Sequence, residues 1–118
     1  MNKGDELAER LLDFTVRIIK LVNSLPKTVI GKHVGVQILH SGTSPGSNYE
    51  ESRGAESRAD FIHKLGIVLK ELKETRFWLR VIHRSEIMSS QLVEPLIQEC
   101  EELCAIIAKS VVTAKAKK

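Results

Sequence analysis

The stretch DFIHKLGIVLKELKETRFWLRVIHR (residues 60–84) decides the fold, because its apolar residues recur at alternating intervals of four and three. This spacing gives one apolar helix face with a period near 3.5 residues, as in helices packed in bundles. Upstream, Ser57 and Asp60 resemble a capping box with Asp in place of Glu. We predict a long helix ending near Arg84, with the core row Phe61, Leu65, Val68, Leu72, Thr75, Leu79 and Ile82.

Upstream, residues 5–24 repeat the pattern with two neighbouring apolar rows. The first runs from Leu7 to Leu25, and the second consists of Ala8, Leu12, Thr15, Ile19 and Val22. Pro26 ends this helix, because the residue before a proline avoids the helical region. Two apolar rows form a wider surface than one neighbouring helix covers, so this segment suggests that the protein forms an oligomer.

The segment after Thr28, its expected N-cap, is the least regular part of the chain. Its predicted core row begins with Ile30 and Val34 and then turns polar, and Pro45 removes a helical hydrogen bond. The helix either ends near Gly42 or is kinked at Pro45 and continues to about Arg53. We favour the kink, because a long loop would be unusual in a small domain. The polar row is predicted to form a buried hydrogen-bonded network, with a ligand pocket as the alternative: Gln37, Ser41, Ser44 and Asn48.

A fourth helix is expected after Ser90, with a basic, frayed tail from about residue 113. Its core row is predicted as Val93, Leu96, Cys100, Leu103 and Ile107. Short loops between four amphipathic helices indicate an all-α, antiparallel up-and-down four-helix bundle, a single domain over residues 1–118. The alternative is a three-helix bundle in which the second helix is a loop.

Composition supports a soluble single domain. The 118 residues are 42% hydrophobic, 28% charged and 4% aromatic. The charged N-terminus does not resemble a signal peptide, and no apolar run approaches the length of a membrane span. Two cysteines make no disulfide framework. We therefore expect a cytoplasmic protein that does not bind membranes.

Catalytic and metal-binding patterns are missing from the sequence. Di-iron bundles use Glu-x-x-His motifs, and this chain has none. Cys100 and Cys104 lie one turn apart and favour core positions over a soft-metal site. His33 and His40 would lie about 10 Å apart on one helix face, too far for one ion. We expect no metal, no cofactor, no small-molecule substrate and no enzymatic activity.

The net charge of +3 conceals a segregated pattern. Residues 58–84 carry seven basic residues against three acids, whereas residues 86–102 carry five acids and no Lys or Arg. Such a basic surface suits a nucleic-acid phosphate backbone. The alternative is that acids of the fourth helix neutralise it, within one chain or between subunits. The candidate nucleic-acid-binding residues are Lys70, Lys73, Arg76, Arg80 and Arg84.

A second candidate surface surrounds Trp78, which lies off the core row of the third helix. Aromatic residues are enriched in protein interfaces. We predict an oligomer interface here, formed by Glu71, Glu74, Phe77 and Trp78.

A set of short motifs between Leu25 and Leu79 is similar to one protein family. The motifs are Leu25-Pro26-Lys27, Gln37-Ile38-Leu39 with Ser41 and Ser44, Asn48-Tyr49-Glu50-Glu51, Ser57, Asp60-Phe61, Lys64-Leu65, Lys70-Glu71, Glu74-Thr75 and Trp78-Leu79. The chain resembles the four-helix bundles encoded by intervening sequences in bacterial 23S ribosomal RNA genes.

The resemblance implies a homopentamer assembled as a short barrel and supports the kinked second helix. A related branch, the accessory proteins of diversity-generating retroelements, associates with a reverse transcriptase and nucleic acid. Residues 76–80 look like that branch too, so the branch assignment depends mainly on residues 37–51. His40 replaces the Arg usual before the family serine, which weakens any phosphate contact by the second helix. The family provides no catalytic residues to carry over.

Overall fold

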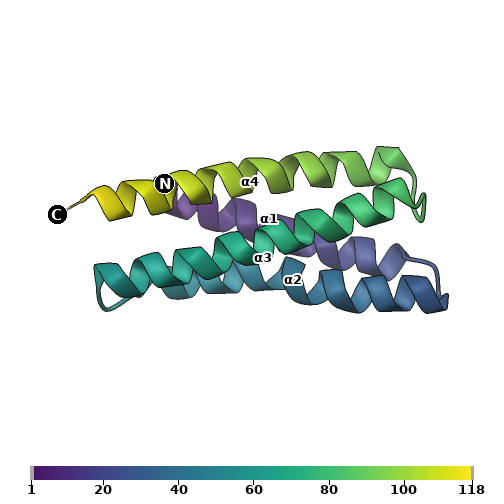
Figure 1. Cartoon of the computed structure of the whole chain (residues 1–118), viewed down its shortest axis with the longest axis horizontal. Coiled ribbons are helices and arrows are strands. Elements are labelled where there is room, and N and C mark those ends of the chain that lie inside the picture. Colours follow the sequence, from purple (N-terminus) through teal and green to yellow (C-terminus); the bar gives the residue numbers. More distant parts are fainter. Residues whose placement is uncertain (1, 118) are drawn as a thin grey trace.

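The computed structural model describes residues 2–117, and within them it contains four helices and no strand. They alternate in direction along a rod with extents of 50 × 22 × 22 Å (Figure 1). The prediction of an all-α four-helix bundle is confirmed. The helices are α1 (Lys3–Ser24), α2 (Val29–Arg53), α3 (Arg58–Arg84) and α4 (Ser90–Ala116).

Three helices begin at a side-chain cap, which satisfies backbone N–H groups that have no partner in the first turn. Asn2 accepts from the Asp5 N–H, Thr28 from the Gly31 N–H and Ser57 from the Asp60 N–H. The fourth cap was predicted one residue late: Ser89 occupies the N-cap position of α4, without a side-chain cap bond. The Ser90 hydroxyl instead lies 3.1 Å from His83 Nε2.

Helix α2 continues through Pro45 to Arg53, so the alternative ending near Gly42 is excluded. The kink at Pro45 stays a prediction. The predicted core row was wrong at Ile30, whose side chain is 62% exposed. Ile30 lies in the first turn of α2, and the neighbouring Gly31 faces inward instead, under the Pro26 carbonyl.

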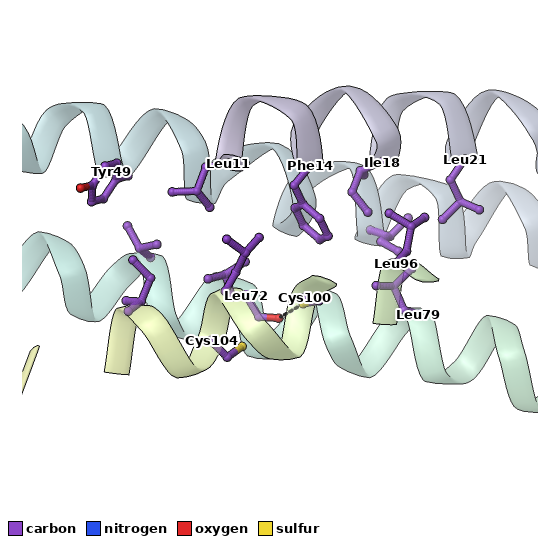
Figure 2. Close-up of a cluster of buried hydrophobic side chains, with 14 of the residues drawn as sticks. Leu11, Phe14, Ile18, Leu21, Tyr49, Leu72, Leu79, Leu96, Cys100 and Cys104 are labelled. Atoms are coloured by element: carbon purple, nitrogen blue, oxygen red, sulfur yellow. Dashed lines mark hydrogen bonds between the residues drawn. The ribbon is translucent and has the colours of Figure 1, made fainter. Parts of the chain in front are cut away.

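The core is a continuous set of apolar side chains from all four helices. Figure 2 shows Leu11, Phe14 and Ile18 of α1 facing Leu72 and Leu79 of α3. The predicted α4 row is buried throughout, and Cys100 Sγ–H donates to the Leu72 carbonyl at 3.2 Å. Among residues 2–117, no helix combines the length and apolar content needed to cross a membrane.

The helices do not contact each other equally. Each packs against its neighbours in the sequence, whereas the contact that closes the bundle between α1 and α4 is much smaller. Both chain ends lie at the same end of the rod (Figure 1). Helix α4 includes residues 113–116, where a tail was expected, and the fraying of that segment stays a prediction.

Candidate functional site

The five predicted nucleic-acid-binding residues of α3 form what we call the basic ridge. Lys70, Lys73, Arg80 and Arg84 are exposed, and Arg76 is half-buried. They recur at helical spacing because the core row of the same helix occupies the opposite face. Within residues 2–117, no carboxylate oxygen lies within the 4.0 Å ion-pair distance of any of these five side chains.

Three α4 acids expected as alternative partners of the ridge have other partners. Arg10 of α1 binds Glu99 through two bonds, Nη2 to Oε1 at 2.6 Å and Nε to Oε2 at 3.1 Å. Arg10 also reaches Glu102 at 3.2 Å. Hydrogen bonding to Glu99 raises the pKa of Arg10. Glu94 lies 3.3 Å from His83. These acids are therefore directed to groups outside the ridge.

At its C-terminal end the basic ridge borders a shallow groove between α3 and α4. Arg80, Arg84 and His83 line one side, and Glu94 and Glu101 line the other. Two α4 acids are therefore close to this end of the ridge, beyond the 4.0 Å ion-pair distance of its arginines. Around the middle of the ridge, Glu74 follows Lys73 on α3, and Glu101 acts on the same two cysteines as Arg76, but within residues 2–117 neither acid forms an ion pair with the ridge.

The middle of the ridge adjoins the two cysteines. The pKa of the Cys104 thiol is lowered, first by its pairing with Cys100 and then by the charges of Arg76 and Lys73. The Cys100 pKa is raised by the same pairing and by burial. Both thiols are free and buried. Among residues 2–117, no cluster of three or more metal-binding side chains occurs.

The four residues of the predicted oligomer interface differ in exposure: Trp78 and Glu71 are partly buried, whereas Phe77 and Glu74 are exposed. Trp78 is half-buried and packs edge-on against His33 of α2, with ring centroids 6.1 Å apart. Phe77 lies against Trp78 and is 57% exposed. Glu74 is exposed, whereas the Glu71 side chain is only 13% exposed and its Oε2 has no hydrogen-bond partner. A part of this surface thus serves packing between α2 and α3, whereas the Phe77 side chain remains exposed to solvent.

The predicted polar row of α2 is separated into two hydrogen-bonded pairs. Ser41 is fully buried and shares a 3.0 Å hydrogen bond with Thr75 of α3. Asn48 donates to the Ser44 hydroxyl at 2.8 Å. Gln37 is half-buried and joins neither pair. The first pair links two helices, and the second stays within α2.

An apolar surface on α1 was only partly foreseen. Leu12, Val16 and Ile19 are 41–55% exposed and follow helical spacing along α1, and Leu39 of neighbouring α2 is 40% exposed. The second apolar row of α1, noted in the sequence, was the available signal for it. We call these four residues the apolar face. Contiguous exposed apolar surface on a small protein marks interaction sites.

Two comparisons with known proteins relate this chain to the same kind of protein. A family model described as 23S rRNA-intervening sequence protein matches residues 6–109. A crystal structure of a protein of unknown function from Bacteroides thetaiotaomicron, described as belonging to the S23 ribosomal protein family, is 36% identical with a TM-score of 0.81. The alignment covers 89% of this chain and 97% of that chain. No curated protein matches the sequence significantly.

Proposed function

The chain belongs to the 23S rRNA-intervening sequence protein family. We propose that it is a homo-oligomeric helical bundle that binds nucleic acid through its basic ridge. The protein has no catalytic role in this proposal and acts as a scaffold on RNA or DNA. The observation that carries it is the set of five α3 cations that have no carboxylate at ion-pair distance within residues 2–117.

The partners of the α4 acids support this proposal. Helix α4 carries four carboxylates beside the five ridge cations, yet Glu99 and Glu102 bind Arg10 on another helix. Aligned like charges on a helix repel one another, so an anionic partner would stabilise the ridge. A phosphate backbone supplies regularly spaced negative charge, and binding would release its condensed counterions.

Self-association is the second part of the proposal. The apolar face on α1 and α2 supplies surface that a single bundle leaves exposed to water. The pentameric number follows from the family resemblance. The apolar face and Phe77 lie on different helices, so each can be tested separately.

The test is a titration of labelled 23S ribosomal RNA fragments at two salt concentrations. We expect micromolar binding that weakens with salt. Arg76→Glu with Arg80→Glu removes two phosphate contacts, which reduces the slope of log affinity against log salt by about 1.5. Lys27→Glu with Lys32→Glu is the matched control, with the same change of charge on exposed residues away from the ridge. Equal losses in both double variants, or no binding at all, would overturn the proposal.

A second candidate function is a protein-interaction scaffold that binds no nucleic acid, its charges serving subunit contacts. The exposed Phe77 beside Trp78 favours it. Light scattering distinguishes the two functions. If the ridge serves subunit contacts, Arg76→Glu with Arg80→Glu lowers the oligomer mass. If the ridge binds phosphate, that variant keeps its mass and loses RNA.

A further inference from the structure

The end of the bundle that holds both chain ends contains a cleft of about 950 Å³ that the proposed function does not use. It lies where α1 and α4 have their small contact, and residues between α2 and α3 close its end. Clefts of several hundred Å³ are of the size that binds small molecules. None of the five basic-ridge residues lines it.

The cleft is strongly cationic. Its walls include one acid, Glu6, against Lys3, Arg10, Arg53, Arg58, Lys109 and Lys117. Arg10 and Arg53 are neutralised by Glu99 and Asp5. Within residues 2–117, no carboxylate lies within 4.0 Å of the other four cations. These four, from three different helices and the C-cap of α4, converge on one opening, which is the arrangement that binds an anion with several oxygens.

The floor of the cleft is apolar, and hydroxyl groups border it. Leu7 is buried, and Phe61 and Ile106 are half-buried, so the floor offers carbon surface to a ligand. Ser57 and Ser110 lie among the lining residues. An apolar floor with a few polar groups at the rim is typical of small-molecule sites.

Two further observations define the closed end. Arg58 donates from Nη1 to the backbone carbonyl of Lys117, which joins the start of α3 to the end of α4. Helices α1 and α3 both begin here, at Lys3 and Arg58, and the dipoles of helix N-termini attract negative charge. Helices α2 and α4 end here, at Arg53 and Ala116, so their negative C-terminal dipoles offset the two N-termini, and the positive charge of the cleft comes from its side chains.

We propose that this cleft binds a phosphate monoester attached to an apolar body, with the phosphate at Lys3, Arg58 and Lys109 and the body on the floor formed by Leu7, Phe61 and Ile106. Such chemistry has two sources, a nucleoside monophosphate and a short-chain lysophosphatidate. The site is separate from the basic ridge, so it extends the proposed function.

Isothermal titration calorimetry of the full chain tests the site with both probes. AMP represents the nucleotide source, and a short-chain lysophosphatidate below its micelle concentration represents the lipid source. Inorganic phosphate and adenosine are the partial probes. We expect saturable binding of one complete probe, at least tenfold tighter than either partial probe. Binding of inorganic phosphate as tight as that of both complete probes overturns the proposal, and so does the absence of binding by both.

Charge reversal locates the bound probe. Lys3→Glu with Arg58→Glu is expected to weaken binding at least tenfold. Both substitutions lie in the first turn of a helix, where a negative charge is favoured, so the fold is kept and circular dichroism checks this. Lys27→Glu with Lys32→Glu is again the matched control, and Lys32 likewise lies in a first helical turn. Equal weakening in the two double variants overturns the assignment to the cleft.

A filled cleft gives an independent measurement. Ser110→Trp places a large side chain at the half-buried wall without changing any charge. We expect it to abolish binding of the complete probe and to leave RNA binding unchanged. Undiminished binding of the complete probe by a folded Ser110→Trp protein overturns the proposal. Conversely, Arg76→Glu with Arg80→Glu should lose RNA and keep the small probe, so the two proposals can fail separately.

Discussion

Helix α1 meets its two spatial neighbours in different ways. Against α2, Gly42 allows so close an approach that an added Cβ would lie 2.7 Å from Ile18 Cγ2. Against α4, the ion pair between Arg10 and Glu99 bridges the two helices. Small residues permit close packing, whereas long charged side chains connect helices across a distance. The difference shows why α1 lies tightly against α2 around Gly42, whereas its smaller contact with α4 leaves room for a cleft.

The largest expected effect breaks the close contact between α1 and α2. Gly42→Ala gains up to about 1 kcal/mol in helix propensity but must displace fully buried Ile18, which costs about 1–3 kcal/mol. We expect a net loss of about 1–2 kcal/mol in the free energy of unfolding, measured with urea at fixed protein concentration. Gly66→Ala is the matched control, because nothing lies within 4 Å of its added Cβ. It should gain up to about 1 kcal/mol, and equal effects at both positions would contradict the packing argument.

The next effect concerns the contact between α1 and α4. Arg10→Gln removes the guanidinium from Glu99, whose side chain is only 20% exposed. Charge-assisted hydrogen bonds contribute more to the free energy of unfolding than neutral ones do. Because this pair is partly exposed, we expect the variant to lose about 1 kcal/mol. Urea unfolding measures the loss, and hydrogen exchange should quicken in α4 around Glu99. Arg17→Gln, at an exposed α1 position, is the control. An Arg10→Gln protein no less stable than this control would show that the bridge contributes nothing.

The smallest effect comes from the ion pair that joins α1 to α2 near the cleft. Arg53 donates to Asp5 at 2.5 Å and lowers the Asp5 pKa. Folding therefore favours the ionised carboxylate, a contribution present above the unfolded pKa of about 3.9 and lost as pH falls through the folded pKa. We expect Asp5→Asn to lower the melting temperature slightly at pH 6 and to match the unchanged protein near pH 2. A difference that persists at low pH would contradict this assignment.

The core could be predicted from the sequence because helical periodicity is a local property. The predicted rows of α3 and α4 lie in the core, with Phe61 at the bundle end half-buried. The prediction that Ile30 lies in the core was wrong, because the chain enters α2 beneath the Pro26 carbonyl and only a glycine, Gly31, fits there. Periodicity describes one helix and does not include its connection to the preceding loop.

The candidate sites are formed by contacts between helices, and helical periodicity does not predict which residues meet across helices. The basic ridge could be placed on α3 from its spacing, but the partners of the α4 acids could not. Arg10 and Glu99 are 89 residues apart, and nothing local indicates their pairing. The cleft was missed for the same reason, since its walls come from all four helices and the loop before α3. Its only trace in the sequence was the basic C-terminal segment.

The shared location of the two chain ends has a consequence for protein engineering. A short linker could join one copy to the next, or close a single copy into a circularly permuted chain with new ends in the loop after Arg84. Tandem genes of defined length would then fix subunit stoichiometry covalently. If the proposed pentamer forms, a chain of five linked copies should match its mass.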